Sequence, residues 1–185
     1  MAFWNAPASQ ENHAELAIRA GVKMRRALKE LNNELVGEGK LAMEIGIGIN
    51  TGDCIVGNMG SDKRFDYTVL GDAVNLAARL EGQSGSYGVN IVLGEETAKK
   101  MPNFKLIELD LIAVKGKTEP VRIYTYLSDL HIDEAAKLKE PQNAMLARYR
   151  DQNWDAAERY LLMAKAQAPE LEKYYQYFQE RINQF

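Results

Sequence analysis

The sequence predicts an α/β fold, because stretches with the two-residue period of a strand alternate with stretches of helical period. Residues 41–50 alternate isoleucines with glycines, which is typical of a strand. Residues 13–35 carry small and apolar side chains at the three-and-four spacing of a buried helical stripe. By the same reasoning we expect strands at 1–5, 41–50, 54–59, 65–70, 89–93, 104–114 and 121–127, and helices at 13–35, 73–81 and 95–100. We place the two longer helices on one face of the sheet.

Composition and charge limit the function classes. The chain has 185 residues, of which 46% are hydrophobic and 26% charged, the mixture of a soluble globular domain with a small appendage. Its net charge of −3 provides no broad basic surface for a nucleic acid, and no apolar run approaches the ~20 residues of a membrane span. Cys54 is the single cysteine, which fits a cytoplasmic location, and its apolar neighbours indicate a small core residue. A membrane anchor elsewhere in the parent protein stays open.

The stretch that organises the sequence is residues 65–83, FDYTVLGDAVNLAARLEGQ. We interpret it as a strand, a tight turn at Gly71 and a helix. Asp72 has the short polar side chain of an N-cap, and Gly82 is the residue expected just past a helix C-terminus. The stretch therefore places a helix N-terminus directly after a strand.

Two polar residues of this helix form a candidate binding face. Asn75 and Arg79 are four residues apart, so they project from the same side of the helix. An amide and a guanidinium near a helix N-terminus suit an anionic ligand. The spacing alone favours an ordinary solvated helix face. Only the neighbouring motifs shift the interpretation toward a binding site.

We expect residues 41–50 and 54–59 to form the two strands of a hairpin. In the first strand, Gly46 and Gly48 lie on the face opposite the isoleucines. We expect another backbone to approach closely there. These glycines do not have the G-x-G-x-x-G spacing of a dinucleotide site. A second motif, at 116–118, resembles the end of a P-loop, but Leu111 stands where a glycine is required and Pro120 where a helix should follow. Both nucleotide motifs are therefore excluded.

Four motifs occur in order along the chain: EIGIGINTGD at 44–53, VGNMGS at 56–61, the stretch 65–83, and VKGK at 114–117. In this order and at these distances they resemble the catalytic domain of the class III nucleotidyl cyclases, the adenylate and guanylate cyclases, over residues 1–127. The resemblance implies a ferredoxin-like sheet. It also implies attack of the ribose 3′-hydroxyl on the α-phosphate of a nucleotide, with release of pyrophosphate. We expect the chain to be the C-terminal part of such a domain.

The resemblance assigns roles to residues that match family positions. Asn75 would orient the ribose, and Arg79 would contact the reacting phosphate. Lys115 would bind the terminal phosphates, with Lys117 as a second candidate. Thr68 matches the base-contacting position and resembles a bacterial subgroup of adenylate cyclases, so ATP is the expected substrate. The lysine that accompanies such a threonine in the family would lie before residue 1.

The family also implies two Mg²⁺ or Mn²⁺ ions per site and a dimer. One subunit of that dimer supplies the metal-binding aspartates, and the other supplies the Asn and Arg. Both aspartate positions fall before the first residue, because segment 1–7 matches the second strand of the hairpin that carries one of them. Asp53, Asp66 and Asp72 match no ligand position, and we interpret them as turn and cap residues. We expect no metal ligands in this chain, a homodimer or a cyclase partner subunit, and an open strand edge at segment 1–7 that pairs with another chain.

Residues 129–185 have no strand pattern, and we separate them as a helical unit from a cyclase unit at 1–128. Pro141 and Pro169 are expected to divide this tail into helices. Its small and aromatic residues resemble one tetratricopeptide-type helix pair followed by a third helix. The simpler interpretation is that the tail packs its aromatic face on the cyclase unit. The functional alternative is a tail that docks a partner.

Three functions stay open on the sequence. The first is part of an adenylate cyclase that serves intracellular signalling, with activity belonging to the intact protein. The second is an inactive cyclase-like module that binds a nucleotide or a partner. The third is an interaction protein with a cyclase-like scaffold. We favour the first, and we expect the isolated chain to be inactive because it lacks the metal-binding aspartates.

Overall fold

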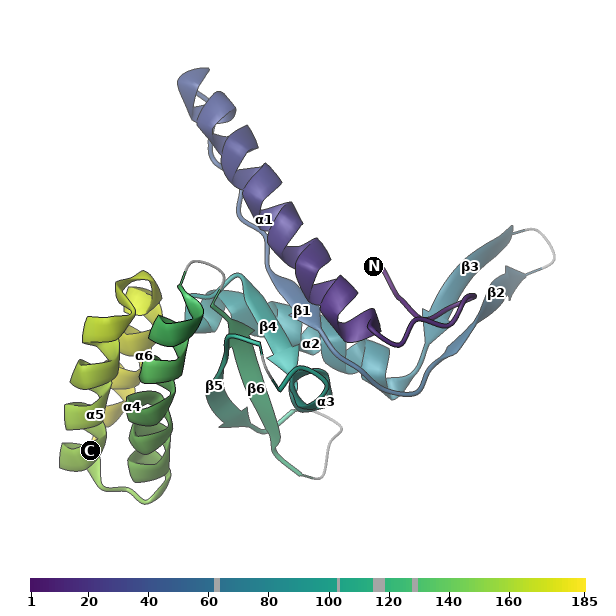
Figure 1. The fold of residues 1–185 in the computed structure, drawn as a ribbon. Coiled ribbons are helices and arrows are strands. Elements are labelled where there is room, and N and C mark those ends of the chain that lie inside the picture. Colours follow the sequence, from purple (N-terminus) through teal and green to yellow (C-terminus); the bar gives the residue numbers. More distant parts are fainter. Residues whose placement is uncertain (62–63, 103, 115–118, 128–129) are drawn as a thin grey trace.

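The computed structural model describes residues 1–185 except 62–63, 103, 115–118 and 128–129. Within this part of the chain, the strands form a four-stranded sheet and a separate two-stranded hairpin (Figure 1). The strands are β1 (Ile47–Ile49), β2 (Ile55–Ser61), β3 (Arg64–Leu70), β4 (Ile91–Gly94), β5 (Leu106–Ile112) and β6 (Val121–Tyr126). The helices are α1 (His13–Gly37), α2 (Asp72–Tyr87), α3 (Glu95–Lys99), α4 (Ile132–Arg150), α5 (Trp154–Gln167) and α6 (Glu172–Ile182), with a 3-10 turn, η1, at Pro169–Leu171.

The four-stranded sheet has the strand order β1-β4-β6-β5. β1 runs parallel to β4, with Ile47 opposite Ile91, whereas β6 pairs antiparallel with both β4 and β5. The α/β class and the strands expected near 89–93, 104–114 and 121–127 are therefore confirmed.

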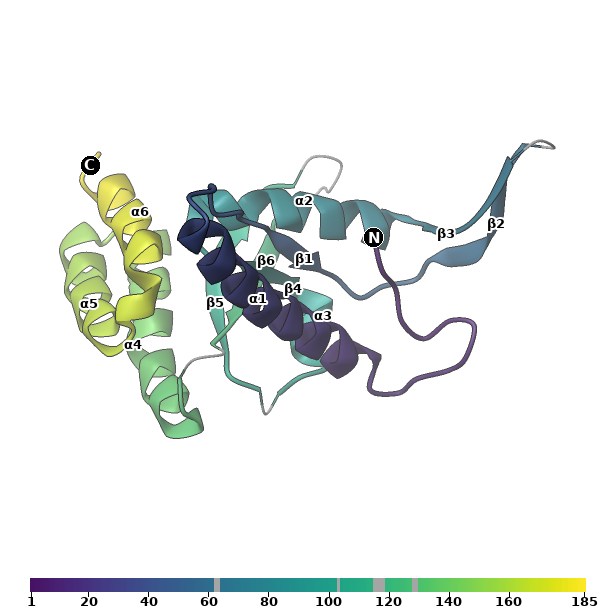
Figure 2. The same ribbon diagram turned by 90° about the horizontal axis from the view of Figure 1, so that it is seen from above.

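The hairpin expected from residues 41–50 and 54–59 is wrong. In the first range only Ile47–Ile49 is a strand, and it pairs with β4. β2 pairs instead with β3, from Ile55 opposite Leu70 to Ser61 opposite Arg64. The β2–β3 pairing extends over the whole length of both strands, whereas β1 has only 3 residues to offer. This β2–β3 hairpin extends away from the main sheet (Figures 1 and 2).

α1 and α2 lie on opposite faces of the sheet, so the expectation that both pack on one face is wrong (Figure 2). Ile47 and Ile91 point toward α1, where a β-carbon on Gly21 would lie 3.5 Å from Ile91 Cδ1. The next residue of β1, Gly48, points toward α2. Successive strand residues face opposite sides of a sheet, so the two helices are on different sides. An amphipathic pattern predicts that one side of a helix is buried. It does not predict on which face of the sheet the helix packs.

The glycine face of β1 holds the backbone of α2, as the sequence predicts. A β-carbon on Gly48 would lie 2.0 Å from the Ala77 carbonyl oxygen and 2.4 Å from the Glu81 amide nitrogen. A β-carbon on Gly46 would lie 2.1 Å from Ser84 Oγ. These separations are far inside van der Waals contact, so the helix can lie this close only over residues that have no side chain.

The sequence predicts that the helix ends at Gly82, but α2 continues to Tyr87. It is terminated by Gly88, whose φ of 63° is the left-handed conformation that glycine adopts readily. Ser84 and Tyr87 are buried, so their packing extends the helix past a residue of low helix propensity. The segment expected as a loop, 83–88, is therefore mostly helical.

The N-terminal segment is not the strand expected at residues 1–5. The Asn5 amide donates to Gln10 Oε1 at 3.1 Å, and the Gln10 amide donates to Asn5 Oδ1 at 2.5 Å. These reciprocal bonds close a local loop that takes up backbone groups a strand would use. Met1 is 85% exposed, while the Phe3 ring lies 5.9 Å from that of Tyr67 in β3. Without a strand here, the expected pairing of its edge with another chain loses its basis.

Only one of the two prolines in the tail ends a helix. Pro169 begins η1 after α5, as expected, but Pro141 lies inside α4. A proline in a helix interior removes one backbone hydrogen bond. We attribute its tolerance here to the burial of the ring within the tail.

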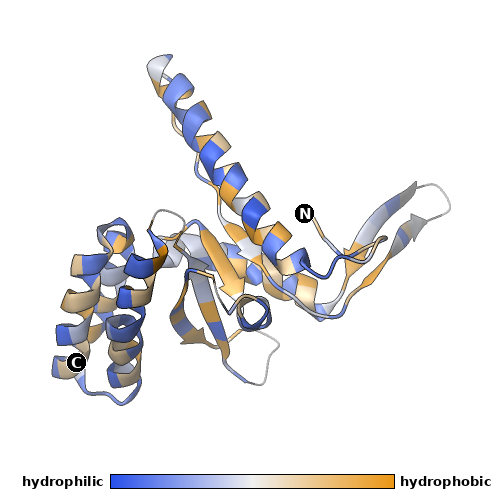
Figure 3. Ribbon diagram, viewed as in Figure 1, coloured by the Kyte–Doolittle hydropathy of each residue, from blue (hydrophilic) through white to orange (hydrophobic). Residues whose placement is uncertain are grey.

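The tail packs on the sheet, which confirms the simpler interpretation. One hydrophobic cluster runs continuously from Leu76 in α2 through β4 and β5 to Ile182 in α6. Its largest members, Tyr174, Tyr175 and Phe178, are fully buried. In Figure 3 the central strands are largely hydrophobic, whereas the part of α1 that extends beyond the sheet is mostly hydrophilic.

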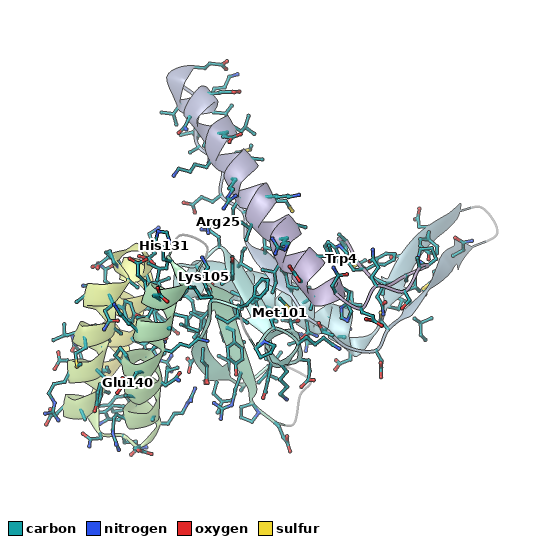
Figure 4. All side chains as sticks on the ribbon, in the orientation of Figure 1. Trp4, Arg25, Met101, Lys105, His131 and Glu140 are labelled. Atoms are coloured by element: carbon teal, nitrogen blue, oxygen red, sulfur yellow. The ribbon has the colours of Figure 1, made fainter. Side chains whose placement is uncertain are left out.

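The junction between the sheet and the tail is held by polar contacts as well. Lys105 Nζ donates to the Leu130 carbonyl at 2.5 Å, just before α4 begins. The His131 amide donates to Glu134 Oε2 at 2.8 Å and so satisfies an amide at the start of the helix. Lys105 and His131 lie near each other at this end of the tail (Figure 4).

Gly48→Ala should lower the free energy of unfolding by about 1–3 kcal/mol, because the new methyl group would overlap the backbone of α2. Gly57→Ala is the matched control: Gly57 also lies in a strand, but a β-carbon there would meet nothing within 4 Å. Urea unfolding followed by circular dichroism measures both changes. Equal stabilities of the two variants would contradict the close approach of α2 to β1.

The buried tyrosines predict a loss of stability at alkaline pH. Burial raises the pKa of Tyr175 above its ordinary value of 10.0, and the charge of Glu170 adds to the effect. Above pH 10 the unfolded chain loses this proton and the folded chain keeps it. The free energy of unfolding should therefore fall by about 1.4 kcal/mol per pH unit for this group.

Tyr175→Phe should reduce that slope, as measured by urea titrations at several pH values above 10. Tyr67→Phe is the control at a position that is 52% exposed. Finding the wild-type slope in Tyr175→Phe would show that Tyr175 ionises equally in the folded and unfolded chain.

Candidate active site

The site is built around the start of α2. Gly71 joins β3 to the helix with a φ of 157°, and a β-carbon there would lie 3.1 Å from the Asp53 carbonyl oxygen. Asp72 is the first helical residue and not the N-cap that the sequence predicts, because Gly71 occupies the cap position. A carboxylate in the first turn still interacts favourably with the helix dipole.

α2 places Asn75 and Arg79 one turn apart on its outer side. Asn75 and Ser84 are separated by nine residues, which corresponds to roughly 180° around the helix. Because Ser84 faces Gly46, the residue just before β1, Asn75 points away from the sheet. Asn75 is exposed and Arg79 is half-buried. The prediction that both share one face is confirmed, while their chemical roles stay predictions.

The N-terminal end of α2 is fixed by residues that the sequence reasoning did not select. Asn50 Nδ2 donates to the Ala73 carbonyl at 3.0 Å and so ties the end of β1 to the first turn of the helix. A β-carbon on Gly94 would lie 2.2 Å from Asn50 Oδ1, so β4 also needs a glycine at this point. Thr51 Oγ1 lies 3.0 Å from Thr97 Oγ1 in α3. The sequence does contain a signal for this contact, because the polar residues Asn50 and Thr51 follow directly after an apolar strand.

Thr68 lies on the β2–β3 hairpin, opposite Gly57. It is half-buried, and the chain reaches the start of α2 four residues later. The structure therefore places Thr68 on the strand that leads into the helix of Asn75 and Arg79, but its contact with a base stays a prediction. Lys115 and Lys117 lie outside the described residues, so their assignment also stays a prediction.

The acidic residues of the described chain do not fit a two-metal centre. No group of three or more His, Cys, Asp or Glu side chains able to hold a metal ion occurs among the described residues. Asp53, Asp66 and Asp72 are all exposed. Cys54, expected in the core, is exposed as well, because the chain leaves the sheet at this point for the β2–β3 hairpin.

Two cavities of the described structure lie away from Asn75 and Arg79. One is a groove of about 530 Å³ between α4 and α5, lined by residues that include Pro141, Tyr160 and Met163. The other, of about 70 Å³, lies where Gly88 meets the end of β6 and η1. Neither cavity is lined by Asn75 or Arg79.

Residues 1–128 match the family described as the adenylate and guanylate cyclase catalytic domain. The chain belongs to this family. Adenylate cyclase 1 of Rhizobium meliloti (strain 1021) is 34% identical over 124 residues, which are 66% of this chain and 19% of that protein. The chain thus spans about a fifth of this curated relative.

Solved structures give the same result for the fold. The adenylyl cyclase CyaB from P. aeruginosa is 35% identical, with a TM-score of 0.61 over 68% of this chain and 65% of that chain. The guanylyl cyclase Cya2 is 34% identical, with a TM-score of 0.58 over 70% of this chain and 68% of that chain. The similarities therefore include both adenylyl and guanylyl cyclases. No helix among the described residues is long and apolar enough to cross a membrane.

Asn75→Ala should leave the free energy of unfolding within about 0.5 kcal/mol of the wild-type value, because the side chain is exposed on the outer face of α2. The neighbouring Leu76 is 7% exposed, and Leu76→Ala should lower it by about 2–5 kcal/mol. Urea unfolding compares the two variants. A large loss of stability in Asn75→Ala would show that Asn75 is a structural residue.

Proposed function

We propose that this chain supplies the ribose- and phosphate-binding half of an adenylate cyclase, which converts ATP to 3′,5′-cyclic AMP and pyrophosphate. The observation that supports the proposal is the placement of Asn75 and Arg79 on one outer face of α2, within a chain of the cyclase family. In the reaction, the 3′-oxygen of the ribose forms a bond to the α-phosphorus while the bond to pyrophosphate breaks.

In this proposal Asn75 and Arg79 divide the binding of the nucleotide. The amide of Asn75 hydrogen-bonds the ribose and so directs its 3′-hydroxyl toward the α-phosphorus. The guanidinium of Arg79 donates to the phosphate oxygens as negative charge accumulates there. Lys115 and Lys117 bind the terminal phosphates. Since the described carboxylates do not fit the Mg²⁺ or Mn²⁺ pair of the family, we assign these ions to groups outside the described residues.

Two arguments favour ATP over GTP. Adenylate cyclase 1 of Rhizobium meliloti is among the similar proteins, and Thr68 has the hydroxyl group that an adenine edge can pair with. GTP is the competing substrate, because Cya2 is a guanylyl cyclase of nearly equal similarity.

The outer position of the binding residues leaves them accessible to a second subunit. We propose a homodimer or a cyclase partner subunit that covers α2 and supplies the metal-binding aspartates. We also propose a cytoplasmic protein of two units, a cyclase unit at 1–128 and a tetratricopeptide-like tail at 129–185.

Complementation tests this function. The purified chain should make no cyclic AMP from ATP with Mg²⁺ or Mn²⁺. Mixed with a cyclase subunit that carries both metal aspartates but has its own Asn and Arg replaced by Ala, it should become active with ATP and less so with GTP. Arg79→Ala should then reduce activity by about 10²–10³-fold, the usual effect of losing one donor to transition-state charge. Arg26→Ala, which removes an exposed arginine on α1, is the control.

Three results would contradict the proposal. Cyclic AMP formation by the chain alone would refute the division of labour. A silent mixture of chains that demonstrably associate would favour the alternative, an inactive cyclase-like binding module. Faster turnover of GTP than of ATP would reassign the substrate.

A further inference from the structure

A buried carboxylate joins three separate elements of the molecule. Asp110 in β5 is 4% exposed. Its Oδ2 accepts from the Tyr87 hydroxyl at 2.8 Å and from Arg181 NH1 at 2.6 Å, while its Oδ1 accepts from the Leu111 amide at 2.8 Å. Tyr87 is the last residue of α2, and Arg181 belongs to the last helix of the tail.

This carboxylate points inward because of an irregularity in β5. The register between β5 and β6 shifts between Glu108 and Asp110, so Leu109 is an extra residue in the ladder. Such a bulge redirects the following side chain. The Leu109 carbonyl accepts from the Tyr174 hydroxyl at 2.7 Å, so a tail residue satisfies the backbone group at the irregular position. The tail therefore contacts β5 at its bulge and satisfies a backbone carbonyl there.

The same tail helix contacts the end of α2 directly. A β-carbon on Gly88 would lie 2.4 Å from Lys173 Cβ, so α6 passes against the residue that terminates α2. The Tyr87 ring packs edge-on against Tyr177 at 5.1 Å. The C-terminal end of α2 is thus held by hydrogen bonding and by packing.

The Arg181 side chain is held in one position by aromatic rings and by Asp110. Its guanidinium lies 4.8 Å from the Tyr149 ring centre and 4.9 Å from that of Phe178, besides pairing with Asp110. Burial lowers the pKa of Arg181, but the hydrogen bond and charge of Asp110 outweigh this, so that its pKa is raised and it stays charged. A buried ion pair adds little net stability, since desolvation offsets the attraction, and its best-supported use is to specify one arrangement.

We propose that Tyr87 and Arg181 are positioning residues for the helix that binds the nucleotide: through Asp110, the tail sets the orientation of α2 and therefore of Asn75 and Arg79. The consequence for catalysis rests on the proposed cyclase function. The mechanical part does not, because a helix transmits a displacement of its last turn to the turns before it.

Amide hydrogen exchange on the full chain tests the mechanical part. Tyr87→Phe removes one hydroxyl and keeps the ring, and Arg181→Met removes the charge and keeps the length. Each should speed exchange in the last turns of α2 about tenfold, the effect of losing one hydrogen bond to a charged group. The double variant should change exchange by less than the product of the single effects, and α1 should be unaffected.

The matched control is Lys165→Met. It breaks the ion pair of Lys165 with Glu172 at 2.9 Å, which lies within the tail and does not involve Asp110. Exchange in α2 should stay at the wild-type rate in this variant. Unchanged exchange in Tyr87→Phe and Arg181→Met, or an equal response to Lys165→Met, would overturn the proposal. If Arg181→Met fails to fold, Tyr87→Phe and Arg181→Lys decide the same question, with Arg181→Lys expected to retain most of the protection.

Activity in the complemented mixture tests the catalytic part. Tyr87→Phe should lower kcat several-fold with KM changed less than about twofold, because misplaced groups lose contacts that form only in the transition state. A wild-type kcat in the presence of faster α2 exchange would show that the tail moves α2 without affecting catalysis and would overturn this part. Silence of the wild-type mixture together with tenfold faster exchange would instead refute the cyclase function and support the positioning of α2 by the tail.

Discussion

The close contact between α2 and β1 is the constraint on which the rest of the structure depends. Gly46 and Gly48 let the helix backbone rest directly on the strand, and Asn50 then bonds to the first turn of the helix. With its inner side pressed onto the sheet, the helix has only its outer side for Asn75 and Arg79. The packing of one helix thus decides that both candidate residues face outward, where the proposed second subunit can reach them.

The sequence correctly predicted those structural features that are determined by neighbouring residues. The alternation of isoleucine and glycine predicted the backbone contact of β1, and the spacing of Asn75 and Arg79 predicted their common face. The strands β4, β5 and β6 followed from their apolar pattern. In each case the deciding interaction involves residues that are neighbours in sequence or a steric rule that holds for any partner.

The errors share a different cause, which is competition between distant elements. Gly82 has the weak helix propensity of a terminus, but the burial of Ser84 and Tyr87 carries α2 past it. Nothing in β1 states that it pairs with β4 in preference to β2, since that choice depends on the energies of both pairings. The Asp110 cluster was not predictable, because Tyr87, Asp110 and Arg181 are far apart in sequence and a bulge decides which way the carboxylate points.

The tail also covers one edge of the sheet. β5 is an edge strand of the sheet, and an open edge invites pairing with another chain. Here Gln142 Nε2 donates to the Glu108 carbonyl at 2.8 Å and the Tyr174 hydroxyl donates to the Leu109 carbonyl, so side chains of the tail occupy backbone groups of β5. These two backbone carbonyls of the β5 edge are therefore not available for pairing with another strand. The tail thus holds the last turn of α2 and covers an edge of the sheet, while Asn75 and Arg79 lie on a different surface, the one to which we assign the proposed partner.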